Sequence, residues 1–407
     1  MNIEKTSINQ LAQRFAEIWS NGEPRFFRAP GRVNLIGEHT DYNDGFVLPI
    51  ALNYQTIVAA SRRDDEKIEV FSINYNELQT FDFTDAPRRQ THEWINYVEG
   101  IARVLRDRGY KIGGANLLID SNVPLGAGLS SSAAIEIAVG LALTNVSGFE
   151  IDKLQLALAG QRAEHEFVGT KSGIMDQFVV TFAVAGHALL IDCRALESEA
   201  IPLNLGDAEI IVCNSGVKHA LASSEYNTRR AECEEGVKLL SEFLPNIRAL
   251  RDVVIADFER FAADLPDVIR RRCRHIITEN ARTLEAADAF KKGDIEAAGR
   301  LMSESHASMR DDFEISCAEI DTLVESAKSF EGVYGSRMTG GGFGGCTINL
   351  VRRDCRDKFI EYIEREYQQK TGRRAETFRG EAGNGAAELQ TSVETDTPIS
   401  VRITQII

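Results

Sequence analysis

A glycine- and serine-rich segment at residues 123–134, VPLGAGLSSSAA, constrains this chain more than any other feature. It follows a short apolar run that predicts a strand over 115–120, and it opens a segment whose apolar spacing predicts a helix over 130–143. Gly126 and Gly128 let the backbone turn tightly and approach a ligand closely. Three serines then occupy the first helical turn, where free N–H groups and the helix dipole favour an anion. The segment therefore predicts a phosphate-binding turn.

Two better-known glycine-rich motifs do not fit this turn. A P-loop would need a lysine just after the second glycine, and the dinucleotide-binding fingerprint GxGxxG would need a glycine where Ser131 stands. A dinucleotide-dependent oxidoreductase is therefore disfavoured. For two glycines alone, an ordinary turn with a serine at the helix start would be the simpler interpretation. The three successive serines and the absence of charge favour phosphate.

A polar segment at residues 29–45, APGRVNLIGEHTDYNDG, predicts a second binding element. Arg32, Glu38, His39 and Asp41 fall within ten positions of one another. For any one of them, a solvated loop charge would be the simpler interpretation. Together they supply both donors and acceptors, which the hydroxyls of a sugar ring require. The segment therefore predicts a polyol-binding loop.

Two further segments carry candidate chemistry. In residues 161–178, QRAEHEFVGTKSGIMDQF, Asp176 is flanked by three apolar side chains. An unpaired anion in apolar surroundings is costly, so Asp176 is expected to have a partner and is a candidate for acid–base work. In residues 335–347, GSRMTGGGFGGCT, five glycines in six positions predict a loop. Its backbone amides can approach the other face of a bound phosphate.

Composition excludes several classes of protein. The 407 residues carry 46 Lys plus Arg and 61 Asp plus Glu, a formal charge of −15, which disfavours nucleic acid or anionic lipid as the main partner. No apolar run is long enough for a membrane span, and the first fifteen residues contain polar residues where a signal peptide needs an apolar core. The seven cysteines form no CxxC pair, so neither a zinc ribbon nor a redox dithiol is indicated. A cytoplasmic protein is expected.

The chain is predicted to divide into two domains, residues 1–200 and 201–407. The second domain is expected to begin with a helical region over 224–308, interrupted near two prolines, and to continue with short strands around the glycine cluster. The polar segment 380–398 predicts a mobile tail. Residues 401–407 are expected to form a final strand.

These four segments, in the order in which they follow one another along the chain, resemble the GHMP kinase superfamily. GRVNLIGEHTDYN at residues 31–43 is similar to the signature of its galactokinase family. PLGAGLSSSAA is similar to the superfamily's nucleotide loop, TGGGFGGC to its third motif, and ASSEYNTRRAECE at 222–234 to a tyrosine-bearing segment of the family. The resemblance implies an α+β fold of two domains with the active site in the cleft between them. The N-terminal domain would be a mixed-sheet domain like domain 2 of ribosomal protein S5, and the C-terminal one a ferredoxin-like GHMP kinase domain. The implied reaction transfers the γ-phosphoryl group of ATP to the C1 hydroxyl of α-D-galactose, giving galactose 1-phosphate and ADP, with Mg²⁺ as cofactor.

The resemblance also implies a role for each matching residue. Asp176 matches the catalytic base, and Arg32 matches an arginine that neutralises charge developing on the phosphoryl oxygens. The expected galactose contacts are Arg32, Glu38, His39, Asp41, Gly173, Asp176 and Tyr226. The expected nucleotide contacts are Pro124, Gly126, Ala127, Gly128, Leu129, Ser130, Ser131, Ser132, Ala133, Gly341 and Gly342. Glu164 and Ser132, with Ser131 as the alternative serine, are the expected magnesium ligands.

Two alternatives stay open beside this interpretation. One is a kinase for a related sugar, such as N-acetylgalactosamine or arabinose, which would share the phosphate machinery. The other is a non-catalytic sensor of galactose and ATP, which the intact serine turn and Asp176 disfavour. Lys171 and Ser172 stand where the family often has a Pro-Cys pair, beside the expected base, and this departure removes no expected ligand. A monomer is expected.

Overall fold

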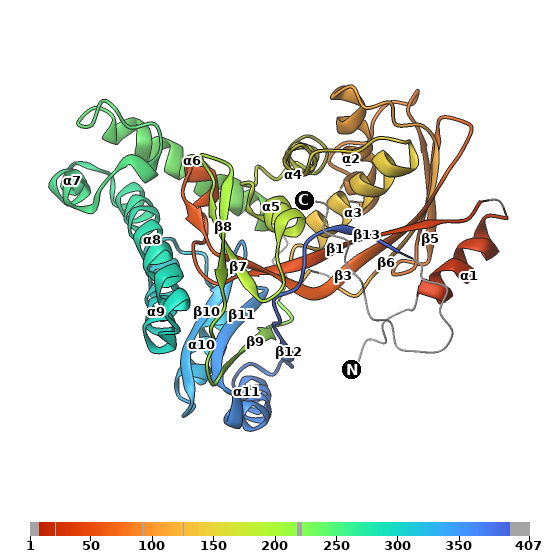
Figure 1. The fold of residues 1–407 in the computed structure, drawn as a ribbon. Helices are drawn as coiled ribbons and strands as arrows, with labels where there is room; N and C mark the ends of the chain where they lie inside the picture. The colour runs from red at the N-terminus through yellow and green to blue at the C-terminus, as the bar shows by residue number, and fades with distance from the viewer. Residues whose placement is uncertain (1–7, 21, 92, 125, 218–221, 391–407) are drawn as a thin grey trace.

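The computed structural model describes residues 8–390 of the chain, apart from residues 21, 92, 125 and 218–221. These residues form two large β-sheets with helices packed against them, joined by a smaller sheet and a long helical segment (Figure 1). The first half of the chain builds most of one sheet, and the second half builds the other. This arrangement confirms the predicted α+β fold.

The first sheet is mixed. Within the described residues its six strands lie in the order β13-β1-β3-β6-β4-β5, and every neighbouring pair is antiparallel except β4 and β6. The strands are β1 (Arg25–Asn34), β3 (Pro49–Arg62), β4 (Lys67–Ser72), β5 (Glu77–Asp82), β6 (Ala115–Ser121) and β13 (Ala387–Leu389). One face packs against α2 (Ile95–Asp107), α3 (Ser131–Val146), α4 (Lys153–Ala163) and α5 (Met175–Phe182), and the other packs against α1 (Ile8–Ile18).

Alternate residues of the central strands fill the two cores on either side of this sheet. Phe27 and Val58 pack beneath α2–α5, whereas their neighbours Phe26 and Ile57 pack against α1. This is the period of two that a strand requires. This alternation fixes the register of β1 up to Pro30. After an irregularity between Pro30 and Arg32, Arg32 lies beside the turn that opens α3.

The second sheet is antiparallel, in the order β10-β11-β9-β12. Its strands are β9 (Ala208–Asn214), β10 (Val333–Thr339), β11 (Cys346–Arg352) and β12 (Glu376–Arg379). Side chains of one face, such as Ile211, pack against α10 (Ala318–Lys328) and α11 (Arg356–Thr371). The alternate residues Ile210 and Val212 face a core shared with the last helices of the helical region and the first sheet. The predicted ferredoxin-like layer is confirmed.

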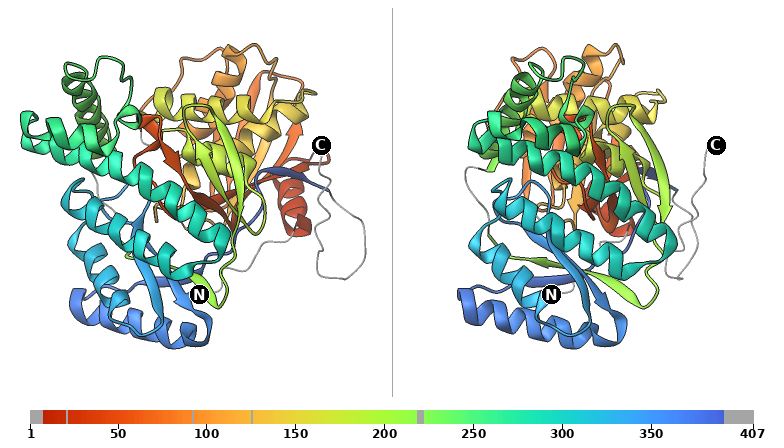
Figure 2. Two further views of the ribbon diagram at one scale, coloured as in Figure 1. Left: turned by 60° about the vertical axis from the view of Figure 1, so that its left-hand side comes forward. Right: turned by 90° about the vertical axis from the view of Figure 1, so that its left-hand side faces the viewer.

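Two smaller parts connect the sheets. A three-stranded sheet holds β2 (Phe46–Val47), β7 (His187–Asp192) and β8 (Glu197–Pro202). The predicted helical region is α6 (Ala222–Leu240), α7 (Ile255–Phe261), α8 (Asp267–Lys292) and α9 (Ile295–Asp311). As predicted, a proline interrupts it, because α8 begins directly after Pro266. Helices α8 and α9 lie side by side over the second sheet (Figure 2).

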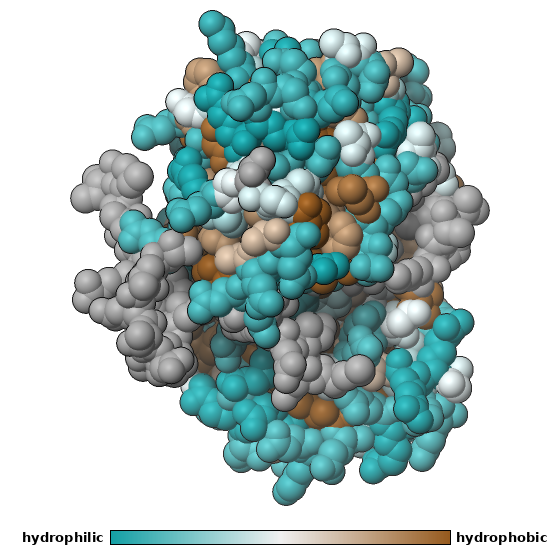
Figure 3. All heavy atoms as spheres, turned by 90° about the vertical axis from the view of Figure 1, so that its right-hand side faces the viewer, coloured by the Kyte–Doolittle hydropathy of each residue, from teal (hydrophilic) through white to brown (hydrophobic). Residues whose placement is uncertain are grey.

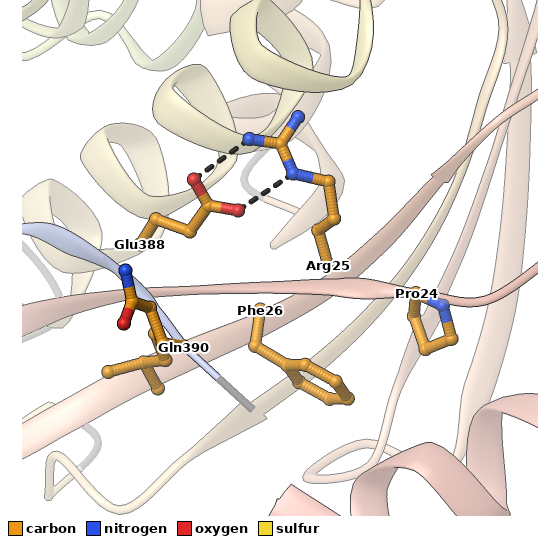
Figure 4. A pocket seen from close by; sticks show the side chains of 6 residues that line it. Pro24, Arg25, Phe26, Glu388 and Gln390 are labelled. Atoms are coloured by element: carbon orange, nitrogen blue, oxygen red, sulfur yellow. Dashed lines mark hydrogen bonds and ion pairs between the residues drawn. The ribbon is translucent and has the colours of Figure 1, made fainter. Parts of the chain in front are cut away.

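The prediction of a mobile tail over 380–398 is wrong for residues 387–389, which form β13 and pair with β1. The Arg25 guanidinium donates two hydrogen bonds to Glu388, of 2.7 and 2.8 Å, beside an open pocket at this edge of the sheet (Figure 4). A Cβ on Gly385 would lie 2.5 Å from the Thr181 carbonyl oxygen. The small residues that resemble a disordered tail therefore let this segment pass close to the first half of the chain. The division into domains at residue 200 stays a prediction, and the final strand predicted for 401–407 lies outside the described residues.

The surface on the side of α1 and β5 is mostly hydrophilic, with apolar side chains gathered near the middle of that face (Figure 3). Most large apolar side chains of the described residues are buried, and Tyr75 and Leu78, each about half exposed, are among the exceptions. None of the described helices is both long enough and apolar enough to cross a membrane.

Candidate active site

Arg32 and Asp176 form the ion pair at the centre of the candidate site. Arg32 comes from β1 and Asp176 from the first turn of α5. Arg32 Nε donates to Asp176 Oδ1 at 2.8 Å, Nη2 donates to Oδ2 at 2.7 Å, and Nη1 donates to the Gly128 carbonyl oxygen at 2.6 Å. Burial lowers the pKa of Arg32, but the nearby carboxylates, led by Asp176, outweigh burial and the pKa is raised overall. The structure therefore joins a buried permanent cation, the predicted base and the predicted phosphate turn.

Ser130 also contacts Asp176. Its hydroxyl donates a hydrogen bond to Asp176 Oδ2, and the residue has a φ of +56°, in the left-handed region that non-glycine residues rarely adopt. Backbone strain of this kind concentrates at functional sites. Helix α3 then begins at Ser131. Sequence reasoning assigned Ser130 to the phosphate turn alone and missed its contact with the carboxylate.

The two glycine-rich segments lie against each other. A Cβ on Gly340 would lie 3.0 Å from the Gly128 carbonyl oxygen, and one on Gly345 would lie 3.2 Å from the Ala127 carbonyl oxygen. Gly340 and Gly345 also have φ angles of +89° and +80°, which favour glycine. The close approach of two backbones explains why this loop between β10 and β11 is rich in glycine.

The other predicted nucleotide residues lie in the turn before α3 and in the glycine-rich loop that faces it. Ser131 and Ser132 form the start of α3 and are partly exposed, whereas the side chains of Ala127, Leu129 and Ala133 are buried. Pro124 and Gly126 precede them, and Gly341 and Gly342 follow Gly340 in the facing loop. The backbone and the serine hydroxyls of the turn, rather than its apolar side chains, are thus left for an anion.

Glu38, in the predicted sugar loop, ties that loop to the glycine cluster. Its Oε1 accepts a hydrogen bond from the Gly340 N–H at 2.9 Å and lies 3.4 Å from Arg337 Nη2. The Glu38 side chain is almost fully buried, and burial raises its pKa although Arg337 and Arg32 oppose the rise. Glu38 is therefore engaged by protein groups on at least one oxygen.

His39 is a neutral ring fixed at both nitrogens. Nδ1 lies 2.7 Å from the Tyr42 hydroxyl, and Nε2 lies 3.1 Å from the Gly341 carbonyl oxygen. A carbonyl oxygen only accepts, so Nε2 carries the proton and Nδ1 accepts from Tyr42. Burial, together with His275, lowers the pKa of His39 to about 3. Its ring centroid lies 4.8 Å from that of Tyr226 in α6, which places the two predicted sugar contacts side by side.

The Asp41 carboxyl lies close enough to Asp176 for the two charges to interact. Burial and the charge of Asp176 raise the pKa of Asp41 to about 7. A side chain on Gly173 would overlap the Asp41 carboxylate, so Gly173 makes room for it. The Gly173 backbone also hydrogen-bonds the phenol of Tyr226, and burial raises the pKa of that phenol well above its ordinary value. A neutral phenol, a carboxyl of intermediate pKa and a backbone segment thus meet beside the Arg32–Asp176 pair.

Glu164, the predicted metal ligand, lies in a π-helical turn, Glu164–Val168, that ends α4. Such turns are rare and often mark functional sites. Its carboxylate accepts hydrogen bonds from Ser172 Oγ at 2.8 Å and from Gln177 Nε2 at 3.0 Å. Burial and the charge of Asp176 raise the pKa of Glu164. A buried carboxylate beside a second carboxylate is a suitable place for a hard divalent cation.

Sequence reasoning missed a second buried carboxylate behind Glu164. Glu136, on α3, is fully buried and accepts a hydrogen bond from the same Gln177 amide group at 3.0 Å. Burial and the charge of Glu164 raise its pKa well above the ordinary value. The available signal was a single charged residue inside the apolar run of α3, four positions after Ser132.

Three family models match the chain in order: a galactokinase galactose-binding signature over residues 13–62, the GHMP kinase N-terminal domain over 96–184 and the GHMP kinase C-terminal domain over 286–369. Galactokinases of Chloroflexus aurantiacus and Chloroflexus aggregans are 47% and 49% identical over 387 residues, covering 95% of this chain and 99% of each relative.

Solved structures agree with these matches. The structure of Lactococcus lactis galactokinase complexed with galactose superposes with a TM-score of 0.91 at 36% identity, covering 94% of this chain and 100% of that one. The mevalonate kinase of Methanococcus jannaschii shares the fold, with a TM-score of 0.62 at 18% identity, over 89% of this chain and 100% of that one. The chain belongs to the galactokinase family of the GHMP kinases.

Proposed function

We propose that this chain transfers the γ-phosphoryl group of ATP to the C1 hydroxyl of α-D-galactose, giving α-D-galactose 1-phosphate and ADP. One observation carries the assignment of the site: the bidentate Arg32–Asp176 pair lies where the serine turn, the sugar signature and the glycine cluster meet. Their sequence positions, 32, 128–130, 176 and 340, are far apart. The match to galactokinases over nearly the whole chain names the sugar.

In this proposal Asp176 takes the proton of the C1 hydroxyl. Phosphoryl transfer passes through a loose transition state in most analyses, so the hydroxyl needs little deprotonation before attack. Asp176 then acts chiefly by orienting the hydroxyl and accepting its proton late. Arg32, held against Asp176, offers positive charge to the transferring phosphoryl group. The rate enhancement comes chiefly from positioning of the reactants and from stabilisation of the charge in the transition state.

The remaining side chains hold the two substrates. Asp41 is proposed to bind the hydroxyls at C3 and C4, and Tyr226 to lie near the one at C4. Glu38 and His39 are proposed to bind the hydroxyl at C6, with His39 exchanging one of its two ring contacts, to Tyr42 or to Gly341, for that hydroxyl. The turn from Pro124 to Ala133, with Gly341 and Gly342 opposite, is proposed to hold the phosphates. This turn offers backbone amides and the hydroxyls of the partly exposed Ser131 and Ser132, which suit an anion.

The residues present fit the magnesium ion that the family implies. Glu164 supplies a buried carboxylate and Ser132 a hydroxyl, both hard oxygen donors. Among the described residues, no group of three or more His, Cys, Asp or Glu side chains is arranged to hold a metal. Magnesium in kinases is held by one or two protein oxygens together with the phosphates, so such a group is not needed. The ion, when bound, neutralises charge on the phosphate oxygens.

We further propose a cytoplasmic monomer. The contacts of Arg32 with Gly128, of Glu38 with Gly340 and of His39 with Tyr226 are made within one copy of the chain, so these contacts require no second copy. The net charge of −15 disfavours binding to nucleic acid or to anionic membranes.

The test is a coupled assay of ADP release with ATP and a panel of galactose, N-acetylgalactosamine, arabinose and glucose, with and without Mg²⁺. Galactose is expected to give the highest kcat/KM, with activity lost on removal of Mg²⁺. Coupling between phosphorus and the anomeric proton in the product would verify transfer to C1. Turnover of N-acetylgalactosamine or arabinose in preference to galactose would reassign the substrate, and binding without turnover would make the chain a sensor.

A further inference from the structure

Three residues on one side of α8 hold the backbone of the sugar loop from outside the site. The Gly37 N–H donates to Glu279 Oε1 at 3.0 Å, and the Phe46 N–H donates to Asn280 Oδ1 at 2.9 Å. Between these two points, His275 Nε2 lies 3.2 Å from the Glu38 carbonyl oxygen. The three contacts bracket the segment from residue 37 to residue 46, which carries the proposed sugar contacts.

The spacing along α8 accounts for this arrangement. His275 and Glu279 are four residues apart, so they lie one above the other on the same face of the helix. Thr283 continues the row, and a Cβ on Gly37 would lie 3.0 Å from its hydroxyl oxygen. A side chain on Gly45 would overlap the Asn280 amide oxygen. The loop and this face of α8 therefore fit each other without spare space.

The anchoring residues are themselves fixed from behind. Glu279 is fully buried and accepts hydrogen bonds from Ser305 Oγ at 2.6 Å and from Arg282 Nε at 2.8 Å. His275 is fully buried, and its Nδ1 lies 2.9 Å from Ser308 Oγ. A buried ion pair is seldom the most stable way to fill a core. Its presence directly beneath the loop indicates a role in holding the loop's geometry.

The loop needs such support because its backbone is strained. His39 and Asp44 have φ angles of +63° and +58°, in the left-handed region, although neither is a glycine. Strained conformations persist only where the surroundings over-determine them. Contacts inside the loop supply part of this support, since Thr40 Oγ1 donates a hydrogen bond to the Gly37 carbonyl oxygen at 2.9 Å. The α8 contacts fix both ends of the same segment.

We propose that His275, Glu279 and Asn280 are positioning residues that set the affinity for the sugar without touching it. This inference rests on the proposed function, because it takes residues 38–41 to be the sugar contacts. Loss of one anchor leaves the phosphate turn and the Arg32–Asp176 pair in place, since none of the three residues contacts either by a hydrogen bond in the described structure. The main effect is therefore expected on the binding of the sugar.

The experiment compares steady-state kinetics of Asn280→Ala and His275→Ala with those of the wild type. Each variant is expected to raise the KM for galactose about fivefold to tenfold, the effect of one lost hydrogen bond. The KM for ATP and the kcat are expected to stay within about twofold, because uniform binding of the sugar is what is lost. His275→Gln, which can place an amide N–H near Nε2, is expected to restore most of the galactose affinity.

A matched control and a second readout separate this role from general destabilisation. Ile276→Ala removes a fully buried side chain of α8 that packs with the helical region, and it is expected to lower the melting temperature without changing either KM. Hydrogen exchange of the Phe46 amide is expected to speed up in Asn280→Ala but not in Ile276→Ala. This exchange needs no turnover.

The outcomes are distinguishable. Failure of the wild type to phosphorylate galactose would sink the proposed function, whatever the variants do. With an active wild type, the inference is overturned if both KM values rise together, or if galactose KM stays at the wild-type value in Asn280→Ala and His275→Ala. If one of these variants does not fold, the other tests the same loop from its opposite end.

Discussion

Replacing Asp176 by asparagine tests the centre of the proposed site. The change keeps the shape of the side chain but turns one carboxylate oxygen into an NH₂ group. In the wild type both carboxylate oxygens accept a hydrogen bond from Arg32, Oδ1 at 2.8 Å and Oδ2 at 2.7 Å, and Oδ2 also accepts one from Ser130. In Asp176→Asn, a donor therefore faces a donor on at least one side.

The cost can be worked out from these contacts. A hydrogen bond between charged partners contributes about 1.5–3 kcal/mol, and Arg32, which loses its counter-ion, is only 5% exposed. Leaving a buried charge without its partner costs about 3–5 kcal/mol. Loss of the proton acceptor adds to this in the transition state. We expect kcat to fall at least ~100-fold, similar to losing one preorganised stabilising group.

The assay is ADP release at saturating galactose and ATP, with circular dichroism and a melting curve to verify folding. Arg32→Ala is expected to lose a similar factor alone. Because the two residues act as a unit, the double variant should lose much less than the product of the two single losses. Near-wild-type turnover by a folded Asp176→Asn would refute the assignment. Fully multiplicative losses in the double variant would show that the ion pair is not the working unit.

Three further predictions follow from single contacts. The pKa of Asp41 is raised to about 7, so its carboxyl becomes neutral as the pH falls below that value; kcat/KM for galactose should then fall up to about tenfold per pH unit, while kcat/KM for ATP at saturating galactose stays flat. Gly173→Ala should raise the KM for galactose at least about tenfold, because the new Cβ displaces the Asp41 carboxylate, and Gly113→Ala, with nothing within 4 Å, should match the wild type. A chain ending at residue 380 should melt about 4 °C or more below one ending at residue 390, because only the latter keeps β13 on β1; equal melting temperatures would count against a stabilising role for that strand.

Local sequence patterns were enough to predict several of the elements and many of the residues that meet at the site. A short apolar run predicts the strand over 115–120, and the proline before α8 predicts a helix boundary. The glycine cluster at 340–345 predicts a loop whose backbone approaches a bound phosphate, and the structure shows this loop close to the backbone of Gly128 and Ala127 in the predicted phosphate turn. Each of these predictions depends on a physical requirement of a few neighbouring residues, which a sequence displays directly.

Contacts set by the tertiary fold could not be predicted in the same way. A serine in the left-handed conformation is indistinguishable in sequence from its neighbours, so the contact of Ser130 with Asp176 was missed. The segment at 380–390 resembles a disordered tail because glycine and small polar residues serve both flexibility and close packing. Only the adjacent backbone of β1 and α5 decides between the two.

The buried charges show how the two halves of the chain depend on each other at the site. Arg32 from the first sheet meets Asp176 within the N-terminal half, whereas Glu38 meets Arg337, and Gly37 meets Glu279, across to the C-terminal half. Such contacts cost desolvation that an apolar core would avoid. They are oriented, however, and an apolar core does not fix the position of a carboxylate or a backbone carbonyl to within a hydrogen bond. We infer that the buried polar contacts between the halves exchange some stability for a sugar loop held at a fixed position, so that its side chains are already oriented for the hydroxyls of one sugar before the sugar binds.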